Sequence, residues 1–135
     1  MPIGYTIDAE QRLVFVRAWG TVTDANLRAQ ARALTDDSRR REEFRLLIDS
    51  RGVTGHGMTL SLLQKYPTPF SKLAPRAVVV GDVYGYALAE VYSRWNAGEG
   101  SAFVTRDIRE AFKWLGLPED TGTPEDLDAV FRADE

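Results

Sequence analysis

Two short runs of almost continuously apolar residues limit the folds open to this chain of 135 residues. The first run is FRLLIDS at residues 44–50, and the second is RAVVVG at residues 76–81. Such runs are typical of strands buried on both faces of a sheet, because helices cover both sides of that sheet. The chain is therefore predicted to adopt an α/β fold with a largely parallel or mixed sheet.

The segments around these runs predict the other elements. Two β-rich runs, GYTID and LVFVRAWG at residues 13–20, flank a short polar connection and predict an antiparallel hairpin at the N-terminus. SAFVT predicts a last strand at residues 101–105. Apolar residues at helical spacing predict four helices, at residues 24–34, 59–66, 84–96 and 106–115. The expected sheet has about five strands, and its helices alternate with strands after the hairpin.

Capping residues support these helices. Thr23 or Asp24 is expected to cap the first helix, and Asp82 and Thr105 the third and fourth. Pro67 and Pro69 end the second helix, because proline disfavours helical geometry in the residue before it.

The last 17 residues differ in charge from the rest. Residues 119–135 hold seven acidic residues and one basic residue, a net charge of −6, whereas residues 1–118 carry +3. We therefore expect one domain over residues 1–118 followed by an acidic tail. Within the tail, TPEDLDAVF combines a cap, a proline at the first helical position and an apolar stripe, which predicts a short docked helix. A homodimer is the expected assembly, because twofold dimers are the commonest oligomers.

Composition excludes several classes of protein. The chain has no cysteine and a single histidine, so disulfides and thiolate metal sites are ruled out. The weak and dispersed positive charge of residues 1–118 does not form a nucleic-acid footprint. The run Arg39-Arg40-Arg41 is followed at once by two glutamates and predicts a solvated loop. No apolar run is long enough for membrane insertion, and no signal peptide is present, so we expect a cytoplasmic protein.

Sequence motifs for catalysis are missing as well. No G-x-S-x-G elbow follows a strand, and the scattered carboxylates have no metal-like spacing. GDVYGYA at residues 81–87 follows a strand, but it matches neither the dinucleotide fingerprint nor the P-loop. We therefore predict no enzymatic activity, no catalytic residues, no metal and no cofactor.

Candidate binding residues gather where strands are expected to end. Open α/β sheets bind ligands at the carboxyl ends of their strands, where the sequence places Asp49, Arg51, His56, Thr59, Asp82 and Tyr84. Each also has a structural interpretation. Asp49 is expected to accept hydrogen bonds from turn N–H groups or Arg51 rather than act as an acid or base. His56 is expected in a solvent-facing loop, and Thr59 as a helix cap.

The order of elements and three motifs, FRLLIDSRGVTG, PRAVVVGD and DIREAFKWL, resemble the SpoIIAA-like family, also called STAS/SEC14-like. The resemblance covers about residues 3–117 and implies the fold of anti-sigma-factor antagonists and of the cytoplasmic domain of sulfate transporters. In the antagonists a D-S-S-G motif carries a phosphorylated serine. Laid over this chain, that motif falls on residues 57–60, where only the hydroxyl of Thr59 remains, so the phosphorylation switch is expected to be lost.

Two functions fit this sequence. The first is a regulatory or protein-interaction domain without enzymatic activity, whose partner is another protein. The second is a module that binds a small apolar molecule or a lipid, which is suggested by the segment PTPFSKLAP and by aromatic residues between positions 84 and 95. Helical spacing of these aromatic residues also fits plain core packing.

Overall fold

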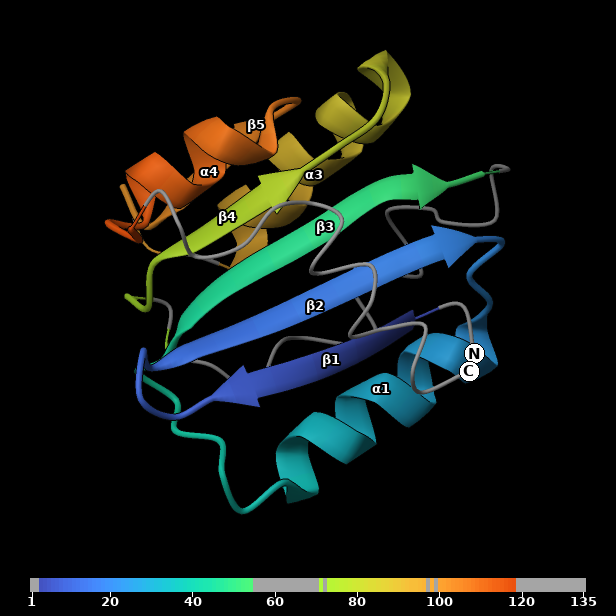
Figure 1. The fold of residues 1–135 in the computed structure, drawn as a ribbon. Coiled ribbons are helices and arrows are strands. Elements are labelled where there is room, and N and C mark those ends of the chain that lie inside the picture. Colours follow the sequence, from blue (N-terminus) through green and yellow to red (C-terminus); the bar gives the residue numbers. More distant parts are fainter. Residues whose placement is uncertain (1–2, 55–70, 72, 97, 99, 119–135) are drawn as a thin grey trace.

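A computed structural model of the chain describes residues 3–54, 71, 73–96, 98 and 100–118. Figure 1 shows the arrangement of its strands and helices. In chain order they are β1 (Ile3–Asp8), β2 (Leu13–Gly20), α1 (Asp24–Asp36), β3 (Arg45–Val53), β4 (Arg76–Val79), α3 (Val83–Asn96), β5 (Ala102–Thr105) and α4 (Ile108–Trp114). The predicted α/β fold, with its N-terminal hairpin and alternating helices and strands, is confirmed.

The five strands form one mixed sheet in which the spatial order follows the chain order, from β1 to β5. β1 is antiparallel to β2, with Ile3 opposite Ala18 and Asp8 opposite Leu13. The pairs β2–β3, β3–β4 and β4–β5 are all parallel. The carboxyl ends of β2, β3, β4 and β5 therefore lie at the same edge of the sheet, on the right in Figure 1.

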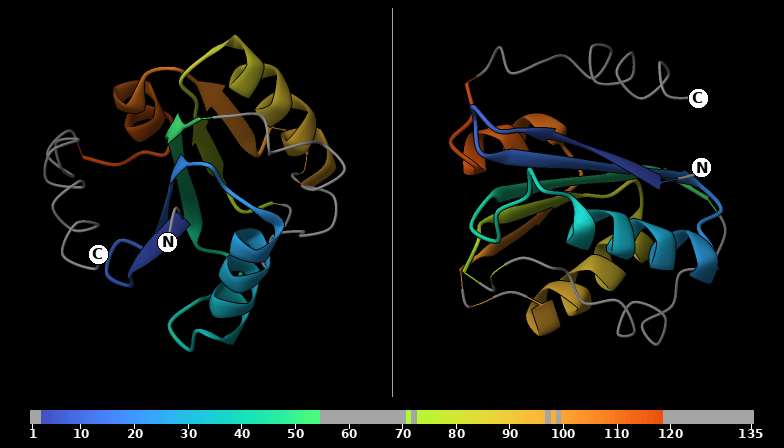
Figure 2. Two further views of the ribbon diagram at one scale, coloured as in Figure 1. Left: turned by 90° about the vertical axis from the view of Figure 1, so that its right-hand side faces the viewer. Right: turned by 90° about the horizontal axis from the view of Figure 1, so that it is seen from below.

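Helices cover both faces of the sheet (Figure 2). On one face, α4 packs on β4 and β5 and completes a core of ten buried residues that includes Phe15, Leu47 and Val79. On the other face lie α1, whose Leu34 is buried against β2, and α3, whose Ala89 is buried against β4 and β5. Burial on both sides explains why β3 and β4 have nearly continuous apolar sequences.

The first turn of α1 forms as its sequence predicts. The backbone N–H of Asn26 donates to the Thr23 hydroxyl at 3.2 Å, and the Asn26 side chain accepts the Thr23 backbone N–H at 2.9 Å. These reciprocal bonds satisfy two donors that a helix otherwise leaves unpaired. Of the two expected caps, Thr23 is therefore the one that the structure uses.

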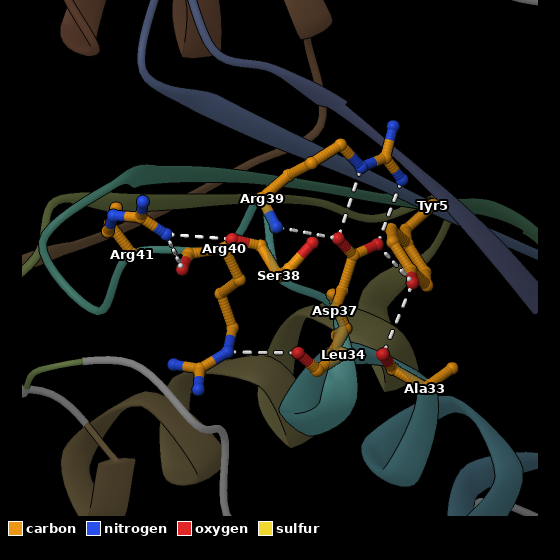
Figure 3. A network of polar contacts seen from close by, with 8 residues as sticks. All are labelled: Tyr5, Ala33, Leu34, Asp37, Ser38, Arg39, Arg40 and Arg41. Atoms are coloured by element: carbon orange, nitrogen blue, oxygen red, sulfur yellow. Dashed lines mark hydrogen bonds and ion pairs between the residues drawn. The ribbon is translucent and has the colours of Figure 1, made fainter.

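The arginine run follows α1 and completes its C-terminal end (Figure 3). Arg40 donates through Nε to the Leu34 carbonyl of α1 at 2.9 Å, whereas Arg41 donates to the Ser38 carbonyl in the loop after the helix at 2.8 Å. Guanidinium groups stabilise this end of a helix because they satisfy free carbonyls and interact favourably with the helix dipole. The run lies in a loop, as predicted, and two of its three side chains are exposed.

A polar network joins the end of α1 to β1 (Figure 3). Both carboxylate oxygens of Asp37 accept hydrogen bonds from the Arg39 guanidinium, at 3.1 and 2.8 Å. The Tyr5 hydroxyl donates to the same carboxylate at 2.8 Å and lies 3.2 Å from the Ala33 carbonyl. Hydrogen bonds from the Arg39 side chain and backbone, followed by the one from Tyr5, hold the pKa of Asp37 well below its usual value of 3.8.

This depressed pKa predicts a pH-dependent contribution of Asp37 to stability. A carboxyl group that is more acidic in the folded chain stabilises the fold above its unfolded pKa, and this contribution is lost as the pH falls toward its folded pKa. Wild type should therefore be more stable than Asp37→Asn at neutral pH, and the difference should shrink below about pH 4. Urea unfolding of both proteins at several pH values measures this difference in the free energy of unfolding. A difference that stays constant from neutral pH to about pH 3 would contradict the assignment.

Three expectations need correction or lie outside the described residues. β3 continues to Val53 instead of ending at residue 50, because Gly52 and Val53 still pair with Trp19 and Gly20 of β2. The N-cap of α4 is Asp107 and not Thr105: its side chain accepts the Arg109 backbone N–H at 2.9 Å. The helix expected at residues 59–66 and the tail over residues 119–135 fall outside the described residues, so the short C-terminal helix stays a prediction.

Candidate functional site

A buried carboxylate lies near the carboxyl end of β3. Asp49 Oδ1 accepts the Arg51 backbone N–H at 3.1 Å and Arg51 Nε at 2.9 Å, and Oδ2 accepts Arg51 Nη2 at 2.8 Å. Asp49 is buried, whereas the Arg51 side chain is partly exposed. The hydrogen bonds with Arg51 that the sequence predicts for Asp49 are thus present in the structure. The bidentate pair fixes Arg51 and leaves part of its side chain at the surface.

A register shift in the sheet explains why this pair forms here. Arg17 of β2 lies opposite Asp49, but the next paired residues are Trp19 and Gly52, so β3 has one residue more than β2 over this stretch. Such a bulge changes the direction of nearby side chains and is common next to functional sites. It allows Arg51 to fold back onto Asp49, two residues earlier.

The loop after β4 touches the backbone of β3 at this point. A Cβ atom on Gly81 would lie only 2.7 Å from the Arg51 carbonyl oxygen, so the close approach requires glycine. The following residue, Asp82, accepts the Gly85 backbone N–H at 2.7 Å and caps the first turn of α3, as predicted. The ends of β3 and β4 and the start of α3 are thereby held in contact.

The first turn of α3 carries exposed apolar and aromatic side chains. Val83 is 75% exposed, Tyr84 45% and Tyr86 40%. Isolated apolar residues are common on protein surfaces, but a cluster in one helical turn is typical of a contact surface. We call this cluster of three residues the α3 patch.

The end of β5 contributes a second set of polar groups to the same edge. The Thr105 hydroxyl lies 2.7 Å from Glu110 Oε2 and accepts the Asp107 backbone N–H at 3.1 Å. Arg106 reaches back to the Gly81 carbonyl, with its Nη2 at 3.2 Å. These contacts tie the start of α4 to the loop that precedes the α3 patch.

The structure therefore brings four of the six candidate residues, Asp49, Arg51, Asp82 and Tyr84, to the carboxyl edge of the sheet. The other two, His56 and Thr59, lie outside the described residues, so their roles as a loop residue and a cap stay predictions. The candidate residues predicted from the sequence did not include Val83 or Arg106, and Tyr86 was considered only among the aromatic residues that suggest an apolar ligand. Val83 and Tyr86 lie in the segment GDVYGYA. The sequence signal for them was the alternation of small and large residues directly after a strand.

A buried arginine lies at the opposite end of β4. Arg76 Nη2 donates to the Ser71 carbonyl at 2.6 Å and Nε to the Ala74 carbonyl at 3.4 Å, while Nη1 has no hydrogen-bond partner among the residues that the structure describes. Burial lowers the pKa of Arg76 and raises the pKa of Tyr92 on α3 to about 12.

The described ranges contain neither a metal site nor a membrane-spanning helix. Among the residues with described positions, no group of three or more His, Cys, Asp or Glu side chains could hold a metal ion. None of the described helices is long and apolar enough to cross a membrane.

Comparison with known proteins identifies the fold. No protein-family model matches the sequence, and no curated protein sequence matches it either. The structure is similar to the crystal structure of an uncharacterized protein of the DUF3478 family from Shewanella loihica PV-4, which is described as having a SpoIIAA-like fold. The two chains are 19% identical, with a TM-score of 0.58 over 84% of this chain and 93% of the other. The chain thus has the SpoIIAA-like fold that its motifs suggest.

Proposed function

We propose that the chain is a regulatory domain without enzymatic activity, and that it binds a protein partner through the carboxyl edge of its sheet. One observation carries this proposal: the α3 patch exposes Val83, Tyr84 and Tyr86 in a single helical turn, at the same end of the sheet as Arg51, which is held in place by Asp49. Tyrosine and arginine are enriched in the energetically important parts of protein interfaces.

The polar groups at this edge support binding rather than catalysis. Asp49 is occupied by Arg51, and Thr105 lies within hydrogen-bond distance of Glu110. A general acid or base must instead reach a proton of the substrate with its own titratable group. The backbone around the patch is held by the Gly81 contact and by the Asp82 cap, which lowers the entropy lost on binding.

The alternative function, binding of a small apolar molecule or lipid, gains no support from the described residues. The described cavity has a volume of about 350 Å³ and is lined by Glu90 and Arg94 as well as small residues. Ligand pockets for apolar molecules are lined mainly by hydrophobic and aromatic side chains. Native mass spectrometry of purified protein would reveal a retained apolar ligand and so favour this alternative.

The proposal predicts that truncating the α3 patch weakens binding without unfolding the chain. The protein serves as bait in an extract of the cells from which it comes, and a retained protein is identified and purified. The dissociation constant of that partner is then measured for wild type and for a variant that combines Val83→Ala and Tyr86→Ala. We expect the constant to rise by a factor on the order of ten to a hundred, because exposed anchors of an interface contribute most of its affinity.

A matched control distinguishes the patch from general surface apolarity. Leu73 is 76% exposed and lies in the loop before β4, at the opposite end of the parallel strands. Leu73→Ala should leave the dissociation constant unchanged. Equal binding by the double variant and wild type, or no retained protein at all, would refute the proposed function.

A further inference from the structure

β5 is an edge strand whose outer hydrogen-bonding groups face away from the sheet. The Arg76 N–H donates to the Ser101 carbonyl and the Val80 N–H to the Thr105 carbonyl, both at 2.9 Å. Main-chain groups alternate in direction along a strand, so the N–H and C=O groups of Ala102 and Val104 point away from β4. Because β5 is the last strand of the sheet, no further strand of the described chain pairs with them.

A cavity of about 350 Å³ lies along this edge, between β5 and the last turns of α3. It is lined by Ala102 and Val104 of β5, by Glu90, Ser93 and Arg94 of α3, and by two glycines of the connection. Ser93 is 7% exposed, and its buried hydroxyl has no hydrogen-bond partner in the described part of the chain. A buried hydroxyl without a partner is costly, so this cavity favours an occupant that can form a hydrogen bond with it.

Glu90 and Arg94 give this edge opposite charges one helical turn apart. Neither residue makes an ion pair with another described residue, although both line the cavity. A twofold axis perpendicular to α3 reverses the direction of this helix in the second copy, so Glu90 of one copy comes to the level of Arg94 of the other. The two charges therefore complement those of a second copy of the same surface.

Aromatic side chains lie on the other face of the same edge. Phe103 of β5 stacks on Trp114 of α4, with ring centroids 5.5 Å apart and an angle of 13° between the ring planes. Trp114 remains exposed. The edge strand thus carries apolar surface on one face and paired charges on the other, on either side of main-chain groups that no described strand pairs with.

We propose that β5 pairs antiparallel with β5 of a second copy of this chain around a twofold axis at Phe103. In this register Ala102 of one copy lies opposite Val104 of the other, and each such pair exchanges both of its main-chain hydrogen bonds. The two five-stranded sheets become one continuous sheet. Glu90 faces Arg94 of the second copy on the α3 side, and the Phe103 and Trp114 rings of the two copies meet on the α4 side. This interface uses the edge strand β5 and does not involve the α3 patch.

The first test removes a main-chain donor from the interface. Ala102→Pro eliminates the outward N–H of the first residue of β5, a position where proline is tolerated in a strand. Light scattering coupled to size exclusion should give wild type a mass twice that of the 15.1 kDa chain. The proline variant should have the mass of a single chain, with circular dichroism confirming that it is folded.

The second test exchanges the two charges and does not depend on proline being accepted. Glu90→Arg and Arg94→Glu each place like charges opposite one another, and each should raise the dimer dissociation constant at least tenfold. The double variant with both changes restores opposite charges across the axis and should restore the dimer. Arg32→Glu on the exposed side of α1 is the matched control and should dimerise as wild type does.

Every outcome of these tests decides the proposal. If the wild-type protein is monomeric at all accessible concentrations, the proposed dimer is wrong, and the edge strand β5 would then pair with a different polypeptide. A dimer that survives both single charge reversals, or a double variant that fails to recover, overturns it in favour of another interface. Loss of the dimer in both single variants and its recovery in the double variant support the proposal. A purely structural effect of the single changes would not be reversed by combining them.

Discussion

Replacing Leu47 with alanine is expected to lower the free energy of unfolding by about 2–5 kcal/mol. Leu47 has 0% exposure and lies in β3, with Phe15 on one side, Ala77 on the other and α4 above it. Truncation removes apolar contacts from every one of these elements and leaves a cavity that closely packed neighbours cannot fill. Urea or thermal unfolding monitored by circular dichroism measures the loss.

The control for this prediction is the same substitution at a surface position. Leu73→Ala deletes the same atoms where the side chain is 76% exposed, and it should change stability by less than about 0.5 kcal/mol. Equal effects of the two substitutions would contradict the placement of Leu47 at the centre of the core beneath α4.

Asp49→Asn is expected to cost about 1–3 kcal/mol, the penalty for leaving a buried polar partner unsatisfied. The carboxylate accepts three hydrogen bonds from Arg51, and an amide replaces one accepting oxygen by an N–H₂ group that faces the guanidinium. The partly exposed Arg51 side chain can regain some contact with water, which keeps the cost below that of a fully buried pair. Chemical denaturation gives the difference directly.

An exposed ion pair serves as the comparison. Asp24 contacts Arg28 one turn later on α1 at 3.0 Å, with both side chains largely exposed, and Asp24→Asn should cost no more than about 0.5 kcal/mol. If Asp49→Asn leaves the melting temperature unchanged and abolishes binding of a partner, Asp49 acts in recognition and the structural interpretation is wrong.

Much of the fold follows from local signals in the sequence. The polar connection between two β-rich runs defines the hairpin, and Thr23 with its partner Asn26 defines the start of α1. The limits of β3 were not predictable in this way, because its last residues have turn-like composition. They form a strand only because β2 offers Trp19 and Gly20 as partners, and the sequence does not reveal that pairing.

The candidate site was predicted in part, for a similar reason. Asp49, Arg51, Asp82 and Tyr84 could be placed because each follows or ends a recognisable strand. Thr105 was misjudged as a cap, because two hydroxyl or carboxylate residues, Thr105 and Asp107, precede α4 and only the backbone geometry decides between them. The contact from Arg106 to Gly81 spans 25 residues, and no local pattern encodes it.

The order of the strands has a consequence for how the chain folds as it is synthesised. Each strand neighbours in space the strand that precedes it in the chain, so no pairing must wait for a distant segment. Contacts close in sequence favour fast folding, because less chain entropy is lost before they form. The sheet can therefore form one strand at a time during translation, beginning with the hairpin. β5 is added last, and no further strand of the described chain pairs with its outer side.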